Sequence, residues 1–177
     1  MRLSHPMKIL TILIGTLVLN MFNASNCRAD ETVTEAMLRA ERLGGLRLGL
    51  PEKDVLKLLG SPATRGKLMF QEADGNYVQD WHYPDKGIDL VMSAGEKKSG
   101  MKTIANITAS APCTFATKKG IKIGDAESAS RKVYAEYADR ESGNEPGSFV
   151  VGSIYGGIIF NFTAGKVSTI FFGAAAE

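Results

Sequence analysis

Apolar side chains recur every three or four positions in the segment that begins at Pro51. Val55, Leu58 and Leu59 share one face at this spacing, which is the period of an α-helix that covers a core. Pro51 suits the first helical turn, and Gly60 is typical of a residue just past the last turn. The pattern predicts a short amphipathic helix.

The stretch after this helix alternates between apolar and polar positions, as half-buried strands do. Four strands are predicted there, and turns rich in Gly, Pro and Asp separate them: 67–73, 77–83, 88–93 and 102–109. Asp74-Gly75 is a typical hairpin turn, so the first two strands are expected to be antiparallel.

A second helix and a second group of strands follow. Ala126, Ala129, Val133 and Tyr137 lie three or four positions apart, and Asp125 precedes them as a candidate cap. Three strands then alternate with short glycine-containing turns: 148–154, 158–163 and 166–172. Turns this short predict an antiparallel meander.

The two halves share a repeat at an offset of 75 residues. Gly45-Leu46-Arg47-Leu48-Gly49 aligns with Gly120-Ile121-Lys122-Ile123-Gly124, and both read glycine, aliphatic, base, aliphatic, glycine. The predicted class is therefore α+β, with two tandem similar units, each a short helix or helix pair packed on an antiparallel sheet of three or four strands. The expected units are 30–110 and 118–177, and 111–117 is the expected linker.

A further helix is predicted ahead of the first repeat, from Thr32 to Gly44. Thr32 and Glu35 have the spacing of a capping box, in which each side chain accepts a backbone N–H of the first turn. This helix is expected to belong to the first unit.

Residues 1–29 have the pattern of a secretion signal. Arg2 and Lys8 precede the apolar run 9–18, which is shorter than the roughly 18 residues that a membrane span needs. The protein is therefore expected to be exported, and to be periplasmic or secreted.

The cleavage region leaves two interpretations open. Small side chains at Cys27 and Ala29 suit the positions before a signal-peptidase cut, which favours a mature start at Asp30. Alternatively Cys27 carries a lipid and the protein is an outer-membrane lipoprotein, although Asn26 stands where such signals have Gly or Ala. Contact with a membrane is expected only in that second case.

Removing residues 1–29 changes the charge. The chain has 21 Lys and Arg against 19 Asp and Glu, and the removed segment contains three bases, Arg2, Lys8 and Arg28, and no acid. The near-neutral remainder gives no electrostatic reason to expect nucleic acid as a partner. The removal also leaves Cys113 as a lone thiol, so no intrachain disulfide can form.

Two resemblances follow from these motifs. The glycine motif, the helix exit Gly60-Ser61-Pro62 and the strand with Trp81-x-Tyr83 resemble the small lipoprotein subunit of the outer-membrane β-barrel assembly machinery. That family has one such unit, whereas a tandem pair is similar to the β-lactamase inhibitory protein. The resemblance implies the architecture and a protein-binding role in the cell envelope, and its matched positions are structural. The disulfides of the inhibitor cannot form here.

The sequence gives little support for catalysis. After the signal, His82 and Cys113 are the only histidine and cysteine, whereas a zinc site needs three or four such ligands. Asp74-Gly75-Asn76 has the residues of a hairpin turn rather than of a calcium-binding loop. Neither glycine motif continues into a phosphate-binding Gly-Lys-Ser/Thr sequence. No catalytic, cofactor-binding or metal residues are expected, and the protein is expected not to be an enzyme.

Aromatic residues are the more informative candidates. Tyr77, Trp81 and Tyr83 fall on one face of the predicted strand 77–83, and Tyr155 lies in a turn of the second half. Tyr and Trp are common interface anchors because they bury a large area and keep a polar tip. The alternative is that these rings pack under the helices. The four residues are the candidate protein-binding site.

The expected function is that of an exported, non-enzymatic, protein-binding module of the bacterial cell envelope. Its partner would be another protein of the periplasm or outer membrane. The alternative is an inhibitor or immunity protein that blocks a secreted enzyme such as a β-lactamase or a lysozyme. Such an inhibitor would present an exposed loop, for which 74–77 and 139–147 are the candidates.

Overall fold

One antiparallel sheet organises the described part of the chain, which in this computed structural model is residues 36–139 and 146–175. The expectations for the signal, Cys27 and the start of the first helix therefore lie outside the described residues. Contacts divide the chain into Met1–Met37 and Leu38–Glu177, and the sheet lies in the second of these units. The predicted α+β class is confirmed.

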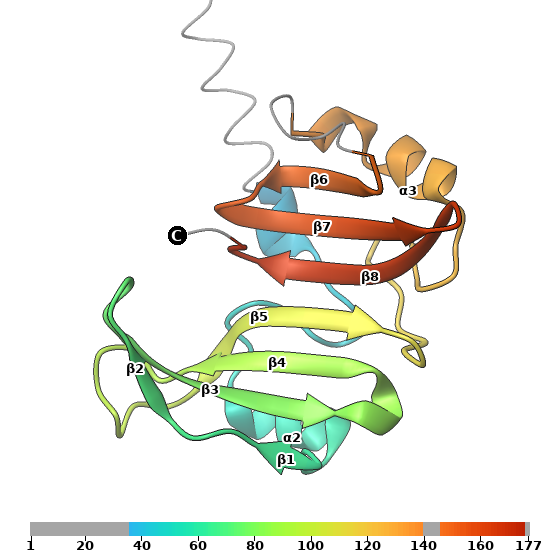
Figure 1. Cartoon of the computed structure of the whole chain (residues 1–177). Helices are drawn as coiled ribbons and strands as arrows, with labels where there is room; N and C mark the ends of the chain where they lie inside the picture. The colour runs from blue at the N-terminus through green and yellow to red at the C-terminus, as the bar shows by residue number, and fades with distance from the viewer. Residues whose placement is uncertain (1–35, 140–145, 176–177) are drawn as a thin grey trace, which may run out of the picture. The chain divides into compact units, whose positions relative to one another are not determined.

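The element labels are those of Figure 1. Besides the helical residues 36–40, the described helices and 3-10 turns are α2 (Glu52–Leu59), α3 (Glu127–Val133), η1 (Pro84–Lys86) and η2 (Ala135–Tyr137). The strands are β1 (Thr64–Arg65), β2 (Met69–Gln71), β3 (Asn76–Tyr83), β4 (Ile88–Ser93), β5 (Thr103–Ser110), β6 (Ser148–Ser153), β7 (Gly156–Thr163) and β8 (Lys166–Gly173). The predicted strands are all found, except that the first, 67–73, is reduced to β2 at Met69–Gln71, and β1 forms ahead of it where no strand was predicted.

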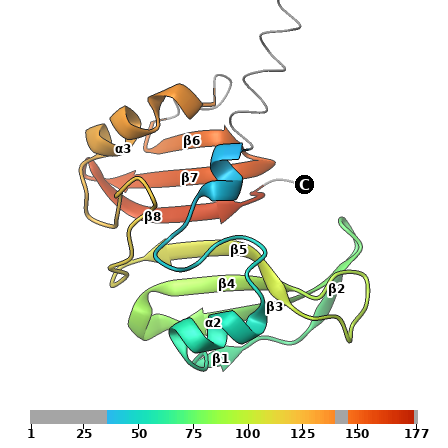
Figure 2. The same cartoon turned by 180° about the vertical axis from the view of Figure 1, so that it is seen from behind.

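All eight strands belong to one sheet, in the order β1-β3-β4-β5-β8-β7-β6, and β2 pairs with β3 beside β1. Every pairing is antiparallel. The strands of both predicted units therefore join directly, through β5 and β8. Figures 1 and 2 show α2 and α3 on the same face of this sheet.

The helix α2 forms as its sequence predicts. Val55 and Leu59 are buried on its inner face, whereas Leu58 is partly exposed. The helix ends at Gly60, whose φ of 79° is in the region that only glycine adopts without strain. The backbone carbonyl of Gly60 accepts a hydrogen bond from the Tyr83 hydroxyl at 3.2 Å, so this helix end is fixed to β3.

The helix α3 differs from its prediction. Its buried residues are Ser130 and, just after the helix, Tyr134, whereas Tyr137 is only half-buried. The α-helix stops at Val133 and continues as the 3-10 turn η2, so the 3.6-residue period assumed for Tyr137 no longer holds. Asp125 is not the cap either, since its carboxylate accepts the backbone N–H of Lys122 at 2.9 Å.

Two parallel rows of side chains form the core between the sheet and its helices. In both rows each residue pairs with the next across neighbouring strands, and all are buried. The first row is Trp81, Leu90, Ile107, Phe172, Ile158 and Val151; the second is Tyr83, Ile88, Ala109, Ile170, Phe160 and Phe149. Because the rows cross six strands without a break, the core is continuous from β3 to β6.

The segment before α2 and the predicted linker are tied together by one buried carboxylate. Residues 36–40 are helical, and Glu41 follows at 3% exposure. Its Oε1 accepts the backbone N–H groups of Lys118 at 2.6 Å and Arg42 at 3.0 Å. Its Oε2 accepts the Tyr134 hydroxyl at 2.9 Å. This carboxylate therefore connects the N-terminal segment, the linker region and the end of α3.

Candidate interaction surface

The two faces of the sheet differ because successive side chains of a strand point to opposite sides. On β3, Trp81 and Tyr83 are buried on the helix-covered face, while Asp80 and His82 are exposed on the other. None of the described helices lies over that second face (Figures 1 and 2). We call the sheet surface opposite α2 and α3 the open face.

Two of the four candidate aromatic residues are not available for binding. Trp81 is 0% exposed and Tyr83 is 3% exposed, so the expectation that they form part of a protein-binding surface is wrong. They lie in the two core rows beneath α2, and burial raises the pKa of the Tyr83 hydroxyl. The alternative interpretation, that these rings pack under a helix, is the correct one for both.

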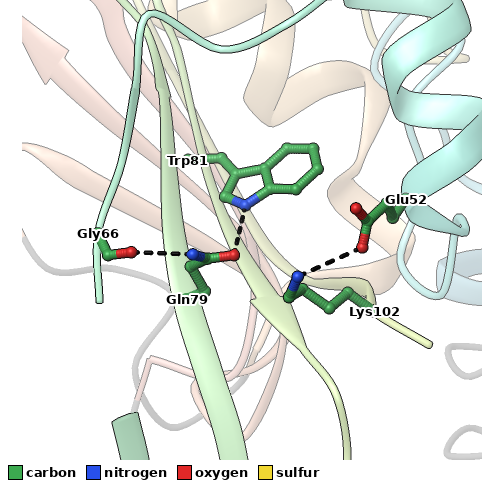
Figure 3. A network of polar contacts seen from close by, with 5 residues as sticks. All are labelled: Glu52, Gly66, Gln79, Trp81 and Lys102. Carbon is green, nitrogen blue, oxygen red and sulfur yellow. Dashed lines mark hydrogen bonds and ion pairs between the residues drawn. The ribbon is translucent and has the colours of Figure 1, made fainter. Parts of the chain in front are cut away.

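Polar contacts hold the Trp81 indole in place (Figure 3). Its Nε1–H donates to Oε1 of Gln79 at 3.0 Å, and the Gln79 amide donates to the Gly66 carbonyl at 2.9 Å. The guanidinium of Arg65 lies 4.3 Å from the ring centroid. Gln79 therefore couples the indole to the chain between β1 and β2, which is a structural role.

The other two aromatic candidates are accessible but lie apart. Tyr155 is 69% exposed in the turn between β6 and β7. Tyr77 is half-buried near the start of β3, and its ring centroid is 5.1 Å from that of Phe70. The candidate site that the sequence predicted is therefore not a single cluster.

The open face carries a row of side chains that runs across six strands. In order from β3 to β6 the paired residues are His82, Asp89, Thr108, Phe171, Ile159 and Val150. His82 and Asp89 are polar and exposed, the next three members are half-buried, and Val150 is buried. The row therefore joins a charged region to an apolar one on the same surface.

The polar end of this row is formed by a hydrogen-bonded pair of side chains. His82 Nδ1 lies 2.7 Å from Asp89 Oδ1, and the two side chains are 47% and 55% exposed. Asp80, two residues before His82 on the same strand, is also exposed. As predicted, His82 lies on the face opposite Trp81 and Tyr83. Because both side chains are exposed, their contact contributes little to stability. The same exposure makes their polar groups accessible to a binding partner.

The thiol of Cys113, a potential nucleophile, is buried and inaccessible. Cys113 is buried, as predicted, and burial raises the pKa of its thiol. A raised pKa leaves less of the reactive thiolate at neutral pH. Within residues 36–139 and 146–175, no group of three His, Cys, Asp or Glu side chains could hold a metal ion, and no helix is long and apolar enough to cross a membrane.

The sequence patterns did not identify the apolar part of the open face. Phe171 stands in the continuous apolar run from Ile170 to Phe172, in which alternation cannot show which residues face the core. The register with β5 decides it, because Phe171 pairs with Thr108. The pairing of polar Thr108 with Phe171 shows that Phe171 lies on the open face, and this pairing is known only once the strands are aligned.

The fold and this surface define a class: an α+β protein whose described helices cover one face of an antiparallel sheet and not the other. Comparison with protein-family models, curated proteins and solved structures gives no match to the chain. Its function is therefore argued from its own residues.

Proposed function

We propose that this protein is an exported, non-enzymatic, protein-binding module of the cell envelope, and that it binds its partner through the open face. The observation that carries the proposal is the cross-strand row, in which the exposed His82–Asp89 pair and the half-buried Phe171 and Ile159 share one uncovered sheet surface. Apolar and charged groups that lie side by side on a surface are typical of protein interfaces.

The chemistry of the row indicates the kind of partner surface that fits it. Asp80 and Asp89 offer carboxylates to a cation or a hydrogen-bond donor, while Phe171 and Ile159 offer apolar area. The partner would therefore present a basic or donor group next to an apolar side chain. We place that partner among the proteins of the periplasm or outer membrane, because residues 1–29 have the pattern of a secretion signal.

We also propose that the sheet was built from two tandem copies of one unit, 30–110 and 118–177. The glycine motifs, 75 residues apart, make equivalent hydrogen bonds. The N–H of Gly49 donates to the carbonyl of Ile104 at 2.7 Å, and the N–H of Gly124 donates to the carbonyl of Val167 at 2.8 Å. In each case the loop before a helix is fixed to the last strand of its own half.

The next residues repeat the same pattern. The N–H of Ile104 donates to the carbonyl of Leu50, and the N–H of Val167 donates to the carbonyl of Asp125. The register of β4 with β5 shifts after Val91, and that of β7 with β8 shifts after Asn161. Matching bonds and matching bulges support a duplication.

The duplication explains why the open face has two different halves. Thr108 of β5 and Phe171 of β8 hold equivalent positions and pair with each other, so an approximate two-fold axis would pass between them. That axis relates Asp89 to Ile159 and His82 to Val150. One copy would have kept a polar row and the other an apolar row, which gives a composite binding surface.

An inhibitor or immunity protein is the second candidate. The β2–β3 hairpin tip favours it, because Glu72 and Asp74 are exposed there and an acidic protruding loop can enter an active site. The other candidate loop falls largely on residues 140–145, outside the described residues. In this case the partner would be a secreted enzyme, and adding the protein would lower its activity.

The proposal is tested by affinity capture from envelope extracts with Ile159→Lys, which places a charge in the apolar part of the row. Leu58→Lys is the matched control, since it makes the same kind of change at a partly exposed residue of α2. We expect wild type and Leu58→Lys to recover the same protein, and Ile159→Lys to recover at least about tenfold less. Equal recovery by both variants would overturn the assignment of the open face.

A further inference from the structure

The two edges of the sheet are not equally protected. At the β6 edge, Ala138 forms a bridge with Val151, and the N–H of Asp139 donates to the carbonyl of Val150 at 2.9 Å. At the opposite edge, β1 and β2 pair only with β3, and no described segment pairs with their outer side. The edge at β2 therefore presents its backbone to the outside.

The direction of the exposed backbone groups follows from the pairing. Phe70 pairs with Tyr77. The backbone of Tyr77 makes its hydrogen bonds on the side away from β2, because its N–H donates to the carbonyl of Gly95 at 2.9 Å and its carbonyl accepts the N–H of Ala94 at 2.8 Å. Because the bonds alternate along an antiparallel pair, the N–H and carbonyl of Phe70 point away from β3. The central residue of β2 thus has a donor and an acceptor at the edge.

The side chains of β2 make this edge unusual. Met69 is 64% exposed and Phe70 is 51% exposed, and they point to opposite faces of the strand. Natural edge strands are usually protected by a charge, a proline or a covering segment. Met69–Gln71 has neither a charge nor a proline, so its two faces and its backbone are all suited to contact with another strand.

We propose that β2 is a self-association edge, at which two copies of this chain pair their β2 strands antiparallel about Phe70. In that register the N–H of each Phe70 donates to the carbonyl of the other, and the two rings lie side by side next to Tyr77. The charges flanking the strand are complementary, because Lys67 lies before it and Glu72 and Asp74 lie after it. An antiparallel pair places the basic end of one copy beside the acidic end of the other.

This interface differs from the open face in its location and in its partner. It joins the two sheets edge to edge, so the open face of each copy continues onto that of the other. A twofold pair of this kind is closed, because each β2 edge is used once and no further copy can add.

The proposal is tested by sedimentation equilibrium of the purified protein over a range of concentrations. We expect the mean mass of the wild type to rise towards twice that of one chain as the concentration increases. Phe70→Pro removes only an outward-facing N–H and should stay monomeric. Tyr155→Ser removes an even more exposed ring elsewhere and should dimerise like the wild type. A monomeric wild type, or a Phe70→Pro variant that dimerises equally, would overturn the proposal.

Amide hydrogen exchange of the wild type keeps the test independent of how Phe70→Pro folds. The N–H of Phe70 is expected to exchange more slowly as the protein concentration rises. The N–H of Met69, which faces β3, should exchange at a rate independent of concentration. A dimer that leaves the exchange of Phe70 unchanged would show that another surface is used.

Discussion

Among the residues that the structure describes, Tyr134 has the ionisation that is linked most strongly to folding. It is completely buried, and its ring centroid lies 5.3 Å from that of Phe160. Burial, with the nearby Glu41 carboxylate, raises the pKa of its hydroxyl far above the ordinary value of 10.0, against the lowering effect of Thr117. The folded protein therefore keeps Tyr134 neutral at a pH at which the unfolded chain ionises it.

The sign of this linkage gives a pH prediction. Because the folded pKa is raised, the stabilisation is fully present below about pH 10 and is lost as the pH rises above it, by at most about 1.4 kcal/mol per pH unit for this group. Urea unfolding at increasing pH should show a steeper alkaline loss of stability in the wild type than in Tyr134→Phe. Tyr83 and Tyr137 titrate in both proteins, so equal slopes would contradict this role of Tyr134.

Single residues also show why the sequence indicated only part of the candidate site. Alternation correctly placed Trp81 and Tyr83 on one face of β3, but it cannot say on which face of a sheet a helix packs. The hydrogen bond from Tyr83 to the end of α2 decides this question, and it joins residues 23 positions apart. Contacts over such separations are not encoded in a local pattern.

At the scale of elements, the Glu41 carboxylate adds the end of α3 to two segments that already share the bridge between Leu43 and Thr117. It accepts two backbone N–H groups and the Tyr134 hydroxyl while almost fully buried. Without it, the buried Tyr134 hydroxyl would lose its acceptor, which costs about 1–3 kcal/mol, whereas the N–H of Lys118 also donates to the carbonyl of Arg42 at 3.0 Å. The linker region and the end of α3 therefore depend on the segment that precedes α2.

Glu41→Ala is expected to lower the free energy of unfolding by about 2–3 kcal/mol, because the buried Tyr134 hydroxyl loses a charged acceptor and two backbone N–H groups lose their bonds to the carboxylate. Glu52→Ala is the matched control, because it removes a partly exposed carboxylate 3.5 Å from Lys102 and should cost about 1 kcal/mol or less. Urea unfolding of both variants measures the difference. Similar losses for the two would contradict the connecting role of Glu41.

The elements that the sequence predicted well are those with strong local signals. Gly75 and Gly165 adopt left-handed backbone angles in the hairpin turns, and such turns delimit the strands around them. The prediction failed where the local signal changes within a segment. The predicted strand 67–73 shrank to Met69–Gln71, and the helical period after Val133 was interrupted by η2.

At the scale of the whole described unit, one sheet performs two tasks. Its helix-covered face holds the two core rows, and its open face holds the row from His82 to Val150. Composition predicts a near-neutral protein with a lone thiol once residues 1–29 are removed, which stays a prediction because those residues lie outside the described part of the chain. The continuity of the sheet from β3 to β6 could not be predicted, because it depends on the register between β5 and β8.

The central claim is that the open face contacts the partner. The most direct measurement is photo-crosslinking in intact cells with a photoreactive residue at position 159 on β7, compared with one at position 58 on α2. We expect a crosslinked product of defined mass from position 159 and none from position 58. A product from position 58 alone, or equally from both positions, would contradict the account.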